Sequence, residues 1–257
     1  MPDLIISALD ASGLQTIVLN RPERANALNS PLLRELESAL DGARTDPKVK
    51  GLIITAIVGE AFSAGADLLE LHGLNESETM AYLELGQRVM RKIERLGKPS
   101  LAAVNGSAMG GGLEMALACS IRVAAENSTF GLPEVRLGVI PGFGGTQRLP
   151  KVIGPARAHQ MILTGETYTA PQALQFGLVN ELTSQQMLSQ ASMTLMKQIV
   201  RNPGEAIAAA LEALACIDEA QDDAAMTRER QLCCSRLSSA DAKRRIASSN
   251  FFRREGI

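Results

Sequence analysis

Strand-length runs of apolar and β-branched residues alternate along this chain with segments that have helical spacing. The first run, "LIISALDASGLQTIVLN", suggests a hairpin that turns at Ser12-Gly13. Two further runs, "VKGLIITAIVG" and "SLAAVNG", have the composition of strands buried on both faces. A helix with a leucine stripe is expected after Asn29, and an amphipathic helix over residues 78–96. This alternation predicts an α/β fold.

The rest of the chain continues the alternation and then becomes helical throughout. We expect a short helix in "LEMALAC", a strand in "IRVAAE", a loop over Gly131–Gly145, helices around 156–163 and 171–177, and a strand in "FGLVNEL". After about residue 184 the spacing is helical, with a break at Asn202-Pro203-Gly204. A chain of 257 residues can bury a full core, and we expect two regions, residues 1–195 and 196–257.

The charge balance argues against a nucleic-acid or membrane partner. With 26 basic and 28 acidic residues, the formal net charge is −2, so no global field draws the chain to DNA or anionic lipid. Aromatic residues make up only 3%, which disfavours stacking on bases. The opening residues lack a signal-peptide pattern and no stretch is apolar enough to span a membrane, so we expect a cytoplasmic protein.

Cysteine and histidine spacing predicts no metal site. No CxxC pair occurs, and two histidines are too few to complete a common zinc pattern with these cysteines. The cysteines are expected to be buried or half-buried free thiols; they are Cys119, Cys216, Cys233 and Cys234.

Three consecutive glycines, Gly110 to Gly112, stand at the start of a predicted helix, where glycine costs about 1 kcal/mol per residue relative to alanine. A Walker loop is excluded because no lysine follows the last glycine. The dinucleotide fingerprint is excluded because "GFGGTQ" has Gln147 where the last glycine belongs. A serine nucleophile elbow is disfavoured because "AFSAG" has an alanine at its first glycine position.

Backbone chemistry remains as the reason for the glycines. A bare helix start lets a ligand oxygen reach free N–H groups, and the helix dipole there favours developing negative charge. The small residues of "FSAGADLLE", from Ala64 to Ala66, leave a second turn equally bare. Two such donors that converge on one carbonyl oxygen would form an oxyanion hole, although each turn alone is equally compatible with a tight strand-to-helix connection.

Two glutamates lie beside these features. Glu114 follows the glycines among apolar neighbours, and Glu134 lies in a loop stiffened by Pro133 and Pro141. Either could be an ordinary solvated carboxylate, at a helix start or in a loop. If they share one site of low dielectric, one proton is expected to be shared between them, and the pair could deliver and remove a proton on one substrate.

The chain resembles the enoyl-CoA hydratase/isomerase (crotonase) family over about residues 14–182. The resemblance is carried by "RPERANALN", "AFSAGADLLE", "LTGETYTAPQALQFGLVNEL" and the long segment "AAVNGSAMGGGLEMALACSIRVAAENSTFGLPEVRLGVIPGFGGTQRLPKVIG". It implies a ClpP-like spiral of ββα units as the core, residues 1–195, with a helical oligomerisation region, residues 196–257. It also implies a homotrimer or a hexamer built as a dimer of trimers.

The resemblance also implies roles for particular residues. The two oxyanion donors fall on the backbone N–H groups of Ala66 and Gly111. Glu114 would deprotonate the water that attacks C3, Glu134 would supply the proton to C2, and Gly142 N–H would help to position the water. Further substrate contacts fall on Arg24, Ala25, Ala64, Asp67, Leu68 and Gly110.

The activity implied is hydration of a trans-2-enoyl-CoA to a 3-hydroxyacyl-CoA in fatty acid β-oxidation, without a metal or redox cofactor, since coenzyme A belongs to the substrate. Alternatives within the family are double-bond isomerisation, retro-aldol cleavage and dehalogenation. A non-catalytic CoA-binding or RNA-binding scaffold is a further alternative. Arg244-Arg245 replaces the usual acidic-Gly pair of the tail, so tail contacts to CoA through Phe252 or Arg253 stay open.

Overall fold

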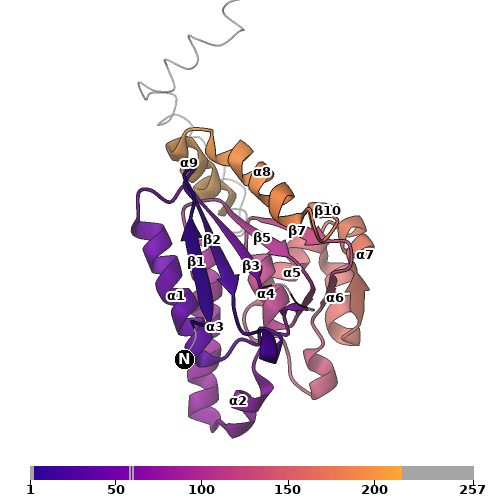
Figure 1. The fold of residues 1–257 in the computed structure, drawn as a ribbon. Coiled ribbons are helices and arrows are strands. Elements are labelled where there is room, and N and C mark those ends of the chain that lie inside the picture. Colours follow the sequence, from indigo (N-terminus) through magenta and orange to yellow (C-terminus); the bar gives the residue numbers. More distant parts are fainter. Residues whose placement is uncertain (1–2, 58, 60, 216–257) are drawn as a thin grey trace, which may run out of the picture. The chain divides into compact units, whose positions relative to one another are not determined.

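The computed structural model describes residues 3–57, 59 and 61–215. Its larger unit contains residues up to Val200, and the described residues 201–215 belong to a second unit. The larger unit is built on a six-stranded sheet in the order β1-β2-β3-β5-β7-β10 (Figure 1). These strands are β1 (Ile5–Leu9), β2 (Leu14–Leu19), β3 (Gly51–Ala56), β5 (Ser100–Val104), β7 (Ile121–Ala125) and β10 (Glu181–Thr183). The α/β prediction is therefore confirmed.

The predicted hairpin is present, because β1 and β2 pair antiparallel with Ile5 opposite Leu19. All later pairs of this sheet, from β2·β3 to β7·β10, are parallel. Strand side chains alternate between two apolar layers: Leu52 and Ile54 join the larger core, whereas Ile53 faces the smaller one. Both faces of the sheet are thus covered, as parallel sheets require.

Helices supply these two layers (Figure 1). On one face lie α1 (Ser30–Thr45), α3 (Glu76–Glu94) and α4 (Gly111–Ala118). The predicted leucine stripe of α1 is buried in the core on this face. On the other face, α8 (Leu188–Val200) packs on β3, β5 and β7 through Leu188, Met196 and Val200. The remaining helices are α2 (Leu68–Gly73), α5 (Gly145–Ile153), α6 (Pro155–Thr164), α7 (Ala170–Gln175) and, in the second unit, α9 (Gly204–Ala215).

A second, four-stranded sheet was not anticipated from the sequence. Its strands are β4 (Ala61–Ser63), β6 (Ser107–Met109), β8 (Thr129–Gly131) and β9 (Thr167–Thr169), in that order. Each has only three residues, too few for a periodic apolar pattern to be read. This sheet positions the site, since β4 and β6 each lead directly into one of the two bare turns.

Three expectations need correction. The interval 145–153, left without an element, forms α5 although Pro150 lies inside it. The loop over Gly131–Gly145 contains a 3-10 helix, Glu134–Leu137. The strand expected in "FGLVNEL" begins only at Glu181, because Gly177 has a left-handed backbone and Leu178 N–H caps α7 on the Ala173 carbonyl.

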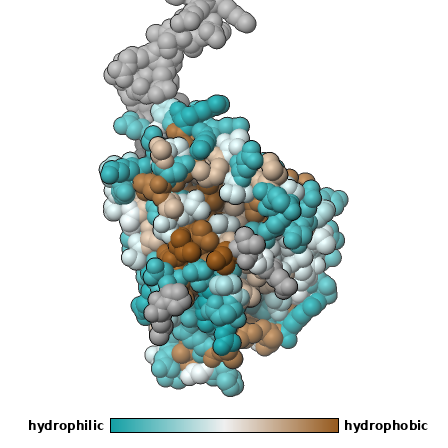
Figure 2. Space-filling view, in the orientation of Figure 1, coloured by the Kyte–Doolittle hydropathy of each residue, from teal (hydrophilic) through white to brown (hydrophobic). Residues whose placement is uncertain are grey.

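Most of the surface seen in Figure 2 is hydrophilic, with hydrophobic residues in small patches. Among the described residues, no helix is long and apolar enough to cross a membrane. Cys119 is a buried free thiol, as expected, and burial raises its pKa to about 12. The other three cysteines lie outside the described residues, as do Arg244, Arg245, Phe252 and Arg253.

Candidate active site

The first bare turn, Ala64–Ala66, leaves the end of β4 and is fixed to the loop that follows β2. Leu28 N–H donates to the Gly65 carbonyl at 2.7 Å, and Ala64 N–H donates to the Ala25 carbonyl at 2.9 Å. Ser63 is fully buried; its Oγ donates to the Asn26 carbonyl and accepts from Gly65 N–H. Because its hydroxyl is occupied in this way, Ser63 is a structural residue and not an exposed nucleophile.

The second bare turn joins β6 to α4. Gly110 has a φ of +49°, and its N–H donates to the Gly131 carbonyl at 2.9 Å. Gly111 is the first residue of α4, so its N–H has no acceptor within the helix. Across the part of the chain that the structure describes, the N–H groups of Ala66 and Gly111 donate to no acceptor.

The two turns touch each other. A Cβ on Gly65, whose φ is +92°, would lie 2.6 Å from the Met109 carbonyl oxygen and 2.9 Å from the Gly111 nitrogen. No side chain fits there, so the backbones approach as only glycine permits. The fold therefore brings together two segments that are far apart in sequence.

Contacts also explain the three consecutive glycines. A Cβ on Gly110 would stand 2.9 Å from Glu134 Oε1, and one on Gly111 would stand 2.9 Å from the Phe143 ring. A Cβ on Gly112 would overlap the Ser63 carbonyl oxygen. Each glycine thus removes a clash with a different neighbour, and Glu134 lies directly against the second turn.

Glu114 is almost completely buried in the first turn of α4, with 1% of its surface exposed. Its Oε1 accepts two backbone hydrogen bonds, from Phe143 N–H at 2.8 Å and Gly145 N–H at 2.6 Å. Burial is the main cause that raises its pKa to about 7; the charge of Glu134 raises it further, whereas the two amides and Arg148 lower it. The carboxyl is consequently held in one orientation and titrates near neutral pH.

Glu134 begins the 3-10 helix and is half-buried. Its Oε2 atom is buried and has no hydrogen-bond partner among the described residues. Burial also raises the pKa of this carboxyl. A buried carboxyl oxygen without a partner is costly, so this atom is suited to meet a proton, a water or a ligand.

The loop Pro141–Gly144 is held by side chains of α3 and α5. The Gly142 carbonyl accepts from Gln87 Nε2 of α3 at 2.9 Å, and the Phe143 carbonyl accepts from Arg148 Nη1 at 2.9 Å. Gly142 N–H donates to no acceptor among the described residues. The structure therefore places this predicted water-positioning amide one residue before the amide that holds Glu114.

A family model described as enoyl-CoA hydratase/isomerase matches residues 10–253. The chain belongs to the enoyl-CoA hydratase/isomerase family.

Individual relatives extend this result. The chain is 45% identical over 175 residues to the crotonyl-CoA hydratase of Syntrophomonas wolfei, which covers 68% of this chain and 67% of the relative. It is 38% identical over 227 residues to the short-chain-enoyl-CoA hydratase of Clostridium acetobutylicum. That match covers 88% of this chain and 87% of the relative. A crystal structure of an enoyl-CoA hydratase from Bacillus anthracis superposes with a TM-score of 0.92 at 33% identity, covering 98% and 97%. The expected crotonase fold is confirmed.

Except for Gly110, which belongs to the second turn, the expected substrate-contact residues lie around the first turn. Arg24 and Ala25 are exposed at the 3-10 turn after β2, and Ala64 is exposed beside them. Leu68 is 58% exposed at the start of α2. Asp67 differs, because its buried carboxylate caps α2 and pairs with Arg21 Nη1 at 2.6 Å. Its side chain is therefore engaged within the fold.

Several residues that hold this site were not singled out from the sequence. Gln87 and Arg148 anchor the loop, and Tyr82 and Phe143 pack beneath it. The amphipathic pattern of α3 is consistent with the burial of Tyr82, but the partners of all four residues depend on tertiary contacts that no local pattern shows. Among the described residues, no group of three His, Cys, Asp or Glu side chains could hold a metal ion.

Proposed function

We propose that this protein is an enoyl-CoA hydratase that adds water across the 2,3 double bond of a trans-2-enoyl-CoA to give a 3-hydroxyacyl-CoA. The observation that carries the proposal is the contact of two bare turns, at Gly65 and Gly111, beside the buried Glu114 and the half-buried Glu134. Relatives named crotonyl-CoA hydratase and short-chain-enoyl-CoA hydratase support it.

The thioester oxygen accepts from Ala66 N–H and Gly111 N–H. Both amides lack acceptors among the described residues, and Gly111 stands at the positive end of the α4 dipole. As water adds, negative charge moves from the double bond to this oxygen as an enolate. Each preorganised donor contributes about 3 kcal/mol to stabilising such a charge.

The two carboxyl groups manage the protons. Glu114, ionised, takes a proton from the water while the water oxygen forms the bond to C3, and Gly142 N–H orients that water. Glu134, protonated, gives its proton to C2. Glu114 ends protonated and Glu134 ionised, and exchange with solvent restores the starting state. The raised pKa values of both groups suit a pair that exchanges protons near neutral pH.

The reaction as written needs no metal and no redox cofactor, since every proton is accounted for by the two glutamates and water. We place the chain in the cytoplasm as a homotrimer or a dimer of trimers, with residues 196–257 as the oligomerisation region. Arg24 and the exposed backbone around Ala25 and Ala64 contact coenzyme A in this proposal.

The test is the reaction of purified protein with crotonyl-CoA. We expect loss of the enoyl-thioester absorbance and a product heavier than the substrate by one water. A product of unchanged mass would indicate isomerisation, and no reaction with any enoyl-CoA from four to sixteen carbons would contradict the proposal. The single variants Glu114→Gln and Glu134→Gln should each reduce kcat by about a hundredfold or more.

A further inference from the structure

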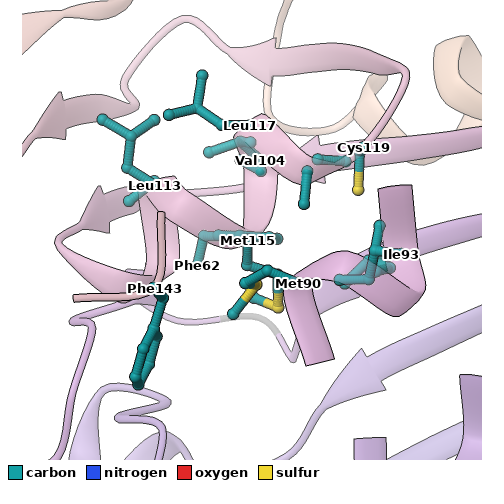
Figure 3. Close-up of a cluster of buried hydrophobic side chains, with 14 of the residues drawn as sticks. Phe62, Met90, Ile93, Val104, Leu113, Met115, Leu117, Cys119 and Phe143 are labelled. Carbon is teal, nitrogen blue, oxygen red and sulfur yellow. The ribbon is translucent and has the colours of Figure 1, made fainter. Parts of the chain in front are cut away.

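The Phe143 side chain occupies an unusual place between two helices. It is 2% exposed and lies in the buried cluster with Leu113, Met115 and Met90 (Figure 3). On one side, a Cβ on Gly86 of α3 would overlap its ring; on the other, a Cβ on Gly111 of α4 would stand 2.9 Å from it. The ring is therefore held between two glycine backbones, with no side chain between it and either helix.

One of those glycines carries a proposed oxyanion donor. Gly111 begins α4, so a ring pressed against it sets how far the first turn of α4 stands from α3. The interior is close-packed, so a displacement of the ring by the width of a methyl group has to be taken up by one of the helices or by the loop.

The ring also contacts the support of the other donor. Its centroid lies 5.5 Å from that of Tyr82, whose hydroxyl donates to the Leu28 carbonyl at 2.5 Å. Leu28 forms the parallel bridge with Ala66, and its N–H donates to the Gly65 carbonyl. Leu28 Cδ1 would also lie 3.2 Å from a Cβ on Gly111. Phe143 thus reaches the Ala66 turn through Tyr82 and Leu28.

The backbone of the same residue holds the general base. Phe143 N–H donates to Glu114 Oε1, and its carbonyl accepts from Arg148. Phe143 therefore contacts Gly111 and Glu114 directly, and it reaches the Ala66 turn through Tyr82 and Leu28.

We infer that Phe143 is a positioning residue. Its ring, packed against Gly86, fixes the distance between α3 and the first turn of α4. In this way it holds the Gly111 amide, the Ala66 turn and the Glu114 carboxyl in fixed positions relative to one another. It acts through these groups and does not itself touch the reacting atoms. The inference rests on the proposed hydration.

The variants follow from the two glycine contacts. Gly86→Ala displaces the Phe143 ring by a steric clash with the new methyl group. Phe143→Ala removes the ring but keeps the backbone amide. The double variant lacks the ring, so the methyl group on residue 86 no longer clashes with it. Gly42→Ala in α1 is the matched control, because nothing lies within 4 Å of its Cβ position. Phe143→Leu serves as a second probe if Gly86→Ala fails to fold.

Kinetics with crotonyl-CoA separate positioning from simple packing. We expect Gly86→Ala and Phe143→Ala each to reduce kcat by about tenfold to a hundredfold with KM changed less than about threefold, and Gly42→Ala to match the wild type. The double variant should be no slower than the slower single variant, since one contact is lost only once. Losses that multiply, or Gly86→Ala with wild-type kcat, would overturn the inference.

A second readout needs no turnover. The pKa of Glu114, followed by the ¹³C shift of its carboxyl in the free protein, should rise in Gly86→Ala and in Phe143→Leu as the Phe143 and Gly145 amides move away from the charged oxygen. An unchanged pKa in both would overturn the positioning role even in an active enzyme. If the wild type does not hydrate enoyl-CoA but the two variants still show this rise in the pKa of Glu114, the proposed function alone is rejected and the positioning role stands.

Discussion

At the scale of single residues, burying the ionised carboxylate of Glu114 has an electrostatic cost. Burial favours the neutral acid, yet two amides and Arg148 favour the ion, and the balance leaves a pKa of about 7. A carboxyl with this pKa is still largely neutral in mild acid, where an exposed glutamate is already ionised. The carboxyl that we propose as the base therefore disfavours the folded state at higher pH.

This cost predicts how stability depends on pH. The pKa of Glu114 is about 7 when folded against an ordinary value of 4.5, so its contribution is fully present below about 4.5 and is lost as pH rises to about 7. Urea unfolding should show Glu114→Gln gaining about 3 kcal/mol relative to wild type between pH 4 and pH 8. Glu126→Gln, at an exposed position, is the control. A difference that does not change with pH would refute this account of Glu114.

Sequence reasoning at this scale proposed the site residues but not the long-range contacts of their side chains. The glycine run and the two glutamates were predicted to meet, and the structure brings Gly110 against Glu134 and Gly65 against Gly111. Asp67 is expected to contact substrate, and the structure shows that its carboxylate also pairs with Arg21, 46 residues away in sequence. A long-range partner of this kind leaves no local pattern to read.

At the scale of elements, the loop Pro141–Gly144 is held by side chains from two helices. Gln87 of α3 holds the Gly142 carbonyl, and Arg148 of α5 holds the Phe143 carbonyl while pairing with Glu94 of α3 at 2.9 Å. Helix α5 therefore connects the loop to α3 as well as following it in the chain. The charge of Arg148 also lowers the pKa of Glu114.

Removing that charge predicts a shift in the pH dependence of activity. Because Arg148 lowers the pKa of Glu114, Arg148→Met should raise this pKa, and the acid limb of the kcat/KM profile should move to higher pH. Arg88→Met removes a cation on α3 that pairs with Glu37 and should leave the limb in place. A limb that moves to lower pH in Arg148→Met, or not at all, would contradict the role assigned to this arginine.

Elements were predictable where they were long and periodic. The hairpin, α1, α3 and the buried strands β3, β5 and β7 all appear where expected. Helix α5 was missed because a proline usually ends a helix, whereas Pro150 lies inside this nine-residue helix. The small sheet was missed because three-residue strands are defined by their partners and not by their own pattern.

At the scale of the whole molecule, the proposed assembly gives a direct expectation. A chain of 27.4 kDa that forms a trimer or a dimer of trimers should elute with three or six times that mass. Light scattering coupled to size-exclusion chromatography of the full chain measures it. A monomer across micromolar concentrations would contradict the proposed role of residues 196–257.

The double variant Glu114→Gln/Glu134→Gln tests the central chemistry most directly, because it keeps both bare turns and removes both proton carriers. Its hydration of crotonyl-CoA should fall by about ten-thousandfold, while calorimetry with a saturated acyl-CoA still shows binding close to that of the wild type. Hydration at the wild-type rate in this variant would contradict the account.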